Sequence, residues 1–148
     1  MLDKRWNAQL LLLGLVAVLQ GCHGDSLQPL RYEDALAAYE LGGDSPNYIC
    51  AIAAEKTVAV DQEFFSVVLL EDKAYIQLAK AGLLEMLLKE AADEYTAYAT
   101  QGIVLRVEVL SRANISEYEE SADQRMRLAF SGALGDFAIT GAAQSCGI

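Results

Sequence analysis

The sequence has very little histidine, proline and positive charge. His23 is the only histidine, so a Ser-His-Asp or Cys-His arrangement inside the folded domain is not expected, nor is a histidine-rich metal site. No Cys-x-x-Cys pair is present for structural zinc. The sequence therefore predicts no metal site, no cofactor and no catalytic residue that can be named.

The charge balance excludes another class of function. The 148 residues carry 11 lysines and arginines against 21 acidic residues, which gives a net charge of −10. Nucleic-acid affinity depends on basic side chains that neutralise phosphates, so no nucleic-acid partner is expected. Only two prolines are present and 53% of the residues are hydrophobic, which argues against disorder and is enough for one folded core.

The amino terminus has the pattern of an export signal. Lys4 and Arg5 precede an apolar run over residues 10–19, and Gln20, Gly21 and Cys22 follow it. Ten apolar residues are too few to span about 30 Å of hydrocarbon as a helix. A short apolar run behind a small positive cluster is typical of a secretory signal.

Leu19-Gln20-Gly21-Cys22 resembles the lipobox of bacterial lipoproteins, and the resemblance covers about the first 22 residues. It implies transfer of diacylglycerol to the Cys22 thiol, cleavage before Cys22 and acylation, such as palmitoylation, of the new terminus. Two or three acyl chains give durable attachment, because each buried methylene contributes about 0.8 kcal/mol. The alternative is an ordinary cleaved signal or an uncleaved anchor, with no role for Cys22.

The residue after the cysteine bears on location. In lipoprotein sorting, Asp at this position favours retention in the inner membrane, whereas this chain has His23. The resemblance therefore implies attachment to the outer membrane of a Gram-negative host, facing the periplasm.

The organisation expected for the chain is a signal peptide over residues 1–21, a lipidated tether over 22–30 and one globular domain over 31–148. Residues 31–41 predict a first helix, and 73–98 predict the strongest helical region, interrupted at Gly82. Leu84, Leu87, Leu88, Ala91 and Tyr95 have the spacing of one apolar helix face.

The later part of the chain changes to a period of two. Ile103, Leu105, Val107 and Val109 would point one way and Arg106 and Glu108 the other, which predicts a half-buried strand. Residues 126–130 and 137–139 alternate similarly around a glycine-containing turn and predict a hairpin. The expected fold class is α+β, with helices in the first two thirds followed by a small antiparallel sheet.

An alternative fold for the same region is a winged-helix-like domain. Residues 75–84, followed by Tyr98-Ala-Thr-Gln-Gly102 and a strand, weakly resemble the helix-then-wing portion of winged-helix domains. Lys73 and Lys80 are the only cations of the presumed recognition helix. The resemblance would therefore imply protein contacts rather than DNA binding.

Two cysteines, Cys50 and Cys146, remain after acylation of Cys22. An even remainder in an oxidising compartment predicts one disulfide between them. Loop entropy for such a long separation gives about 4–5 kcal/mol of stabilisation as an upper limit. Two free thiols or an intermolecular bridge are the alternatives.

Two groups of side chains remain as candidate binding residues. Glu117, Glu119, Glu120 and Asp123 form an acidic cluster, which is either a solvated surface or a site for a cation or basic partner. The chain also has seven tyrosines, a residue type that suits both binding surfaces and the edge of a core. The tyrosines are Tyr32, Tyr39, Tyr48, Tyr75, Tyr95, Tyr98 and Tyr118.

These patterns favour a membrane-anchored envelope lipoprotein that acts as a non-enzymatic protein-binding or assembly module. Its expected partners are the membrane, through the lipid anchor, and an envelope protein. Confinement at the membrane raises the effective concentration of such a partner. The alternative function is a carboxylate-based hydrolase of an envelope polymer, which would need a cleft with a carboxyl pair.

The lipid anchor gives a direct prediction. Replacing Cys22→Ala removes the thiol that would accept the lipid, so metabolic labelling with palmitate should be lost and the domain should leave the membrane fraction. Labelling that persists in Cys22→Ala would contradict the assignment of this residue.

Overall fold

The computed structural model describes residues 24–55 and 63–148, and in this part of the chain it is almost entirely β-sheet with a single helix. The elements in chain order are β1 (Leu27–Gln28), β2 (Leu30–Arg31), α2 (Tyr32–Glu40), β3 (Ile49–Ala54), β4 (Phe64–Phe65), β5 (Val67–Leu70), β6 (Lys73–Leu78), β7 (Gly82–Ala91), β8 (Tyr95–Thr100), β9 (Ile103–Ala113), β10 (Ser121–Gly132) and β11 (Phe137–Gly147).

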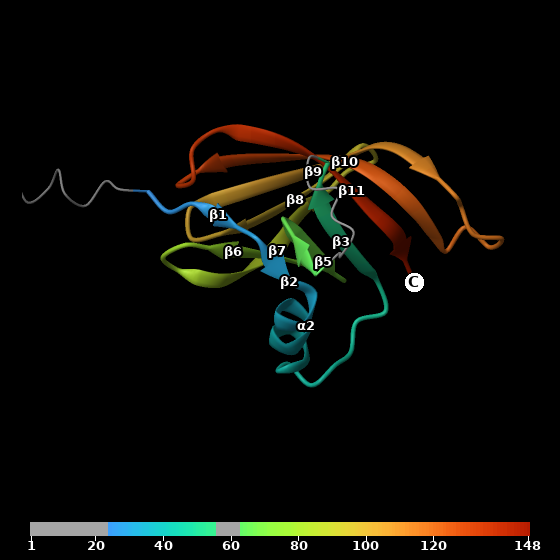
Figure 1. The fold of residues 1–148 in the computed structure, drawn as a ribbon, viewed down its shortest axis with the longest axis horizontal. Coiled ribbons are helices and arrows are strands. Elements are labelled where there is room, and N and C mark those ends of the chain that lie inside the picture. Colours follow the sequence, from blue (N-terminus) through green and yellow to red (C-terminus); the bar gives the residue numbers. More distant parts are fainter. Residues whose placement is uncertain (1–23, 56–62) are drawn as a thin grey trace, which may run out of the picture.

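The main sheet closes on itself to form a barrel (Figure 1). Each strand from β5 to β11 pairs antiparallel with the next one in the chain. The circle is completed by β3, which pairs with β5 on one side and with β11 on the other. Within the described residues the barrel therefore has eight strands in up-and-down order, with β1 added alongside β6.

The expected α+β class is therefore wrong, and residues 73–98 show why. This region forms β6, β7 and most of β8 instead of helices. Leu84 and Met86 are buried whereas Glu85 and Leu87 are exposed, which is the period of two of a strand. Leucine, glutamate and lysine are good helix formers, but pairing of β7 with β6 and β8 on either side overrides this local preference.

Gly82 starts a strand and does not interrupt a helix. It has a φ of 78° at the start of β7, directly after the turn from β6, and does not divide two helices. Glu85 contacts β6 instead of the next helical turn: it lies 3.2 Å from Lys73 Nζ and accepts a 2.8 Å hydrogen bond from the Tyr75 hydroxyl. The winged-helix alternative is also wrong. Residues 75–84, which would form its recognition helix, belong to the β6–β7 hairpin.

Three other elements agree with the sequence prediction. The helix expected over residues 31–41 is α2. The strand expected from Ile103 is β9, which continues to Ala113. The expected hairpin is β10 and β11, joined through the glycine-containing turn.

The barrel interior is packed with apolar side chains at one end, here called the packed end. The turns between β6 and β7, β8 and β9, and β10 and β11 meet there (Figure 1). The Phe130 and Phe137 rings stack 5.0 Å apart, and Ala133 N–H donates to the Gly102 carbonyl at 2.9 Å. The hydrogen bond joins the β8–β9 and β10–β11 turns, and the stacked rings hold the two strands of the β10–β11 hairpin together.

α2 packs on the outer surface of β5 and β6. The run Val67–Leu70 is buried on both faces, because Val67 and Leu69 point into the barrel whereas Val68 and Leu70 lie under the helix with Ala35. A continuous apolar run is expected for a strand covered on both sides. Over the described residues, no helix is long and apolar enough to cross a membrane.

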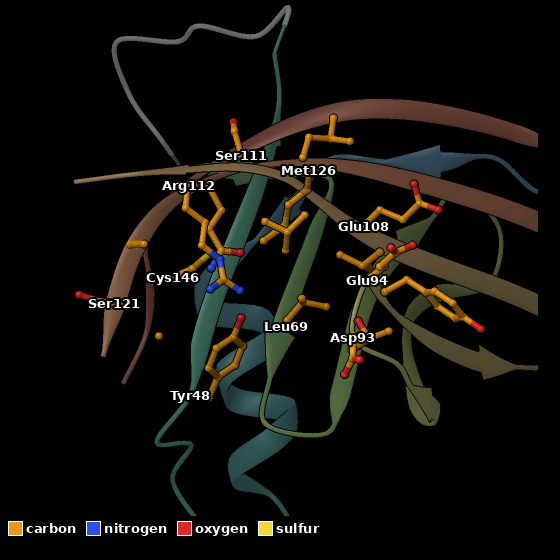
Figure 2. Close-up of a pocket in the computed structure, with 18 of the residues that line it drawn as sticks. Tyr48, Leu69, Asp93, Glu94, Glu108, Ser111, Arg112, Ser121, Met126 and Cys146 are labelled. Carbon is orange, nitrogen blue, oxygen red and sulfur yellow. The ribbon is translucent and has the colours of Figure 1, made fainter. Parts of the chain in front are cut away.

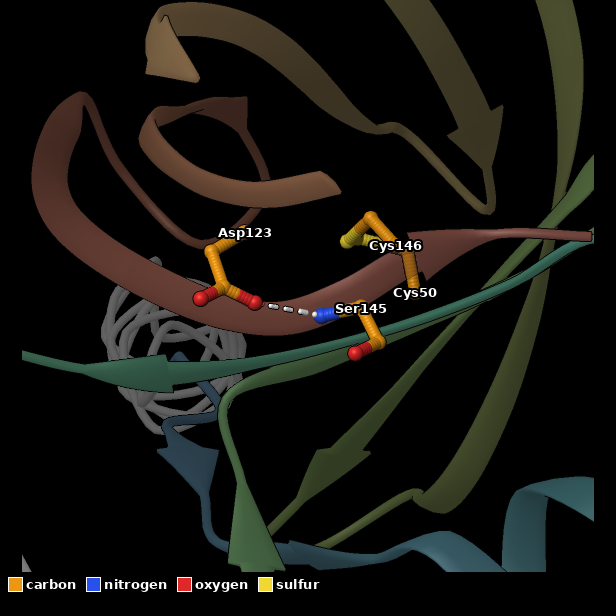
Figure 3. Close-up of a disulfide and its surroundings, with 4 residues drawn as sticks. All are labelled: Cys50, Asp123, Ser145 and Cys146. Carbon is orange, nitrogen blue, oxygen red and sulfur yellow. Dashed lines mark hydrogen bonds between the residues drawn. A yellow bond between two sulfur atoms is a disulfide. The ribbon is translucent and has the colours of Figure 1, made fainter. Parts of the chain in front are cut away.

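The barrel is closed covalently as well as by hydrogen bonds. Cys50 on β3 and Cys146 on β11 form a disulfide with a Cα–Cα distance of 4.5 Å (Figure 3). This confirms the predicted disulfide. It joins the first and last barrel strands, so it links the two edges that an open sheet would leave unpaired.

Candidate functional site

The barrel is hollow at the end opposite the packed end, and we call this space the hollow (Figure 2). It has a volume of about 1300 Å³ and is open to solvent. Its apolar lining is provided by side chains from five strands, namely Leu69, Leu88, Tyr98, Val107 and Met126. Polar and charged side chains line the rest of it. Small-molecule sites combine apolar side chains with polar groups that orient the ligand.

Arg112 points into the hollow because of a β-bulge in β9. Val109 lies opposite Met126 of β10, but Ser111 lies opposite Arg125, so Leu110 is an extra residue. Before the bulge the odd-numbered residues of β9 face the interior, and after it Arg112 pairs with Gln124 on the interior side. The extra residue therefore turns a charged side chain inward that strict alternation would place outside.

Arg112 meets Tyr48 at the mouth of the hollow, where its guanidinium points toward the tyrosine hydroxyl (Figure 2). Burial raises the pKa of Tyr48 and the neighbouring Tyr98 raises it further, whereas the positive charge of Arg112 lowers it. Both tyrosines are thus neutral hydrogen-bonding groups at physiological pH. Within the part of the chain that the structure describes, the Arg112 guanidinium makes no hydrogen bond or ion pair.

A second bulge turns Cys146 inward. Between Ala143 and Cys146, β11 has one more residue than β10 has between Gln124 and Ala122. Ser145 takes up the bulge with a φ of 50°, and its N–H donates to Asp123 Oδ1 at 2.8 Å (Figure 3). Asn114 Nδ2 donates to the other oxygen of Asp123 at 2.7 Å. Asp123 therefore fixes the bulge that brings Cys146 to the disulfide and to the wall of the hollow.

The acidic cluster predicted from sequence divides between two roles. Glu119 and Glu120 lie at the mouth of the hollow with Asp93 and Glu94, and all four are exposed. Asp123 has the structural role just described. The mouth thus carries four exposed carboxylates beside the exposed cation Arg112.

Glu71 has a structural role at the same rim. Its carboxylate accepts the N–H groups of Asn47 at 2.5 Å and of Tyr48 at 3.1 Å, and its own N–H donates to the Tyr48 carbonyl at 3.2 Å. Glu71 has a φ of 53°, which is unusual for a residue with a side chain. These bonds hold the segment before β3 against the turn from β5 to β6 and so position Tyr48.

No group of three or more histidine, cysteine or acidic side chains in residues 24–55 and 63–148 is arranged to hold a metal ion. The predicted lipidation residue, Cys22, and the signal peptide lie outside the described residues. Residues 25–30, which fall in the expected tether, include β1, which pairs with β6, and Leu30 of β2, which pairs with β4.

The residues at the hollow were only partly indicated by the sequence. Tyr48 and Tyr98 belong to the seven tyrosines proposed for an interface or core edge, and they line the hollow together. The sequence does not predict Arg112 as a residue of the hollow. The pattern that indicates it is the break in the apolar alternation of β9 after Val109. This break can be interpreted as a bulge only when the partner strand is known.

Comparison of the chain with protein-family models, with curated proteins and with solved structures gave no match. The function proposed below therefore depends on the geometry of the chain itself.

The Asp123 contacts predict a pH-dependent stability. The Asn114 amide, followed by the Ser145 N–H, lowers the pKa of Asp123 below its ordinary 3.8, and burial opposes them weakly. A carboxyl whose folded-state pKa is depressed stabilises the fold above its unfolded pKa, and this stabilisation is lost as pH falls through the folded value.

Asp123→Asn should therefore lower the urea midpoint at pH 7, and the difference from the native protein should shrink below about pH 3.8. Asp136→Asn is the matched control, because Asp136 is exposed in the turn between β10 and β11. Equal effects of the two substitutions at pH 7 would show that the Asp123 contacts do not stabilise the bulge.

Proposed function

We propose that this protein is a membrane-anchored envelope lipoprotein whose barrel binds one small amphipathic molecule and does not catalyse a reaction. The observation that carries the proposal is the hollow, with its apolar lining and the Arg112 guanidinium at its mouth. Eight-stranded barrels are just wide enough to be filled by side chains or to hold one small ligand. Here the packed end follows the first pattern and the hollow the second.

The side chains at the hollow favour a ligand with an apolar tail and a single anionic head group. Leu69, Leu88 and Met126 would contact the tail. Arg112 would pair with the head group, with the Tyr48 hydroxyl able to donate a further hydrogen bond. A charge-assisted hydrogen bond contributes about 1.5–3 kcal/mol, and one anion would satisfy a guanidinium that the described chain leaves unpaired.

The anchor is proposed from sequence. Cys22 in its lipobox-like setting would carry the lipid, and His23 after it favours the outer membrane with the domain in the periplasm. Anchoring is consistent with a binding role, because it confines the domain to the envelope and so raises the effective concentration of partners in that compartment.

A hydrolase is less well supported by the geometry. Asp93, Glu94, Glu119 and Glu120 are all exposed at the mouth of the hollow. A carboxyl general acid is normally made by burial in an apolar pocket, which these four residues do not have.

A protein-binding module is the second candidate, and one observation favours it. The hairpin of β9 and β10 extends past the mouth of the barrel and exposes Leu110, Ile115 and Tyr118, with exposed fractions of 46%, 56% and 77%. Exposed apolar and aromatic side chains close together are common at protein interfaces. This surface would bind an envelope protein without using the hollow.

The amphiphile proposal predicts saturable binding of cis-parinaric acid, a fluorescent fatty acid, to the mature domain. Arg112→Gln should weaken this binding about tenfold, which corresponds to about 1.4 kcal/mol, because the head group loses its charged partner. Binding of the matching alcohol should not change. The measurement is a fluorescence titration at fixed ionic strength.

Arg127→Gln is the control, since Arg127 lies on the outer face of β10, 3.9 Å from Glu108. Equal weakening by both substitutions would rule out a specific head-group contact. If binding of cis-parinaric acid is not saturable, the hollow does not hold an amphiphile. If the β9–β10 hairpin also crosslinks to one envelope protein in cells, the protein-binding module becomes the supported function.

A further inference from the structure

The first described residues are fixed to the packed end of the barrel. Asp25 Oδ1 accepts the N–H groups of Ser26 at 2.9 Å and Lys80 at 2.7 Å, and Asp25 Oδ2 accepts the N–H of Ala81 at 2.7 Å. Ala79 N–H donates to the Ser26 carbonyl at 2.9 Å. Leu27 then pairs with Leu78 as β1 joins β6.

The charged form of Asp25 is the one that makes these contacts. Burial acts to raise the pKa of Asp25, but the N–H groups of Lys80, Ala81 and Ser26 and the charge of Lys80 lower it below its ordinary value. At neutral pH the carboxylate therefore accepts three backbone N–H groups, two of them from the turn between β6 and β7. Residue 25 is a fixed point on the barrel rather than part of a free linker.

Very little chain separates this fixed point from Cys22. Gly24 is two residues after Cys22, and two extended residues span at most about 7 Å. The head-group layer on each side of a bilayer is roughly 5–7 Å thick, since the full thickness of about 40–45 Å includes about 30 Å of hydrocarbon. A lipid on Cys22 would therefore bring Gly24 to the head groups.

The packed end of the barrel carries fewer carboxylates than the opposite end, as a position against lipid head groups would require. Described carboxylates at the packed end are Asp25, which accepts backbone N–H groups, and Asp136. Phe137 is 38% exposed at the same end. The opposite end has exposed acidic side chains on three connections, namely Asp72, Asp93, Glu94, Glu117, Glu119 and Glu120. An anionic lipid surface repels such an end.

From this geometry we infer that the packed end of the barrel rests against the lipid head groups and the mouth of the hollow faces away from the membrane. The inference rests on the proposed lipid anchor at Cys22. Figure 1 shows β1 at the same end as the tips of the β6–β7 and β10–β11 hairpins, with the carboxyl terminus at the other end. A ligand would thus exchange with the aqueous compartment or with a second protein, and not directly with the anchoring bilayer.

Single tryptophans can test the orientation. The one tryptophan of the chain, Trp6, lies before Cys22, so the processed protein has none. Phe137→Trp places a tryptophan at the packed end, and Tyr118→Trp places one on the β9–β10 hairpin, where Tyr118 is 77% exposed. Both replace one aromatic residue by another. The acylated variants, processed at Cys22 and therefore without Trp6, would be reconstituted in vesicles containing a lipid with a nitroxide on its head group.

We expect the nitroxide lipid to quench Phe137→Trp several-fold more strongly than Tyr118→Trp. Equal quenching, reversed quenching, or no quenching of either variant on vesicles that carry the protein would overturn the orientation and leave the anchor intact. An unlipidated protein that does not float with vesicles would instead overturn the anchor, and the orientation with it. Ala133→Trp, in the exposed turn between β10 and β11, replaces Phe137→Trp if that variant does not fold.

Discussion

The pairing of β3 with β11 is the constraint on which the other features depend, because it converts a row of antiparallel strands into a closed barrel. Closure decides which side chains are interior. It also brings Cys50 and Cys146 within a Cα–Cα distance of 4.5 Å, although they are 96 residues apart in sequence. The disulfide in turn limits how far the two strands can separate.

A closed barrel has two ends, and this chain uses them differently. At the packed end, short hairpin turns meet and buried apolar side chains such as Ile103, Leu105 and Phe130 fill the interior. At the other end, bulges near Leu110 and at Ser145 interrupt the alternation and turn Arg112 and Cys146 toward the hollow. Irregularities in the strands thus supply the polar group that regular strands would have left outside, and they lie where a ligand would enter.

The sequence predicts the parts of this structure that depend on local patterns. Leu105, Val107 and Val109 alternate with Arg106 and Glu108, and β9 forms there. The β10–β11 hairpin and α2 are also predicted from local patterns. The failure over residues 73–98 has a physical cause. Leu84 and Leu88 fit a helix face as well as a strand face, and their neighbours are helix formers, so only the pairing with the adjacent strands β6 and β8 decides between the two.

The candidate site was harder to predict than the fold because its residues become neighbours only through closure. Tyr48 precedes β3, Tyr98 is on β8 and Arg112 follows a bulge in β9, so no sequence spacing links them. The disulfide could be predicted because cysteine count and compartment constrain it without a fold.

Closure of the eight-stranded barrel is tested most directly by nuclear Overhauser contacts in the mature domain. Antiparallel pairing predicts contacts between Ala53 and Ala142 across β3 and β11, and between Lys73 and Leu87 across β6 and β7, in the same molecule. An open sheet would lack one of these two sets. Helical contacts between residues three apart over residues 83–98 would contradict the barrel altogether.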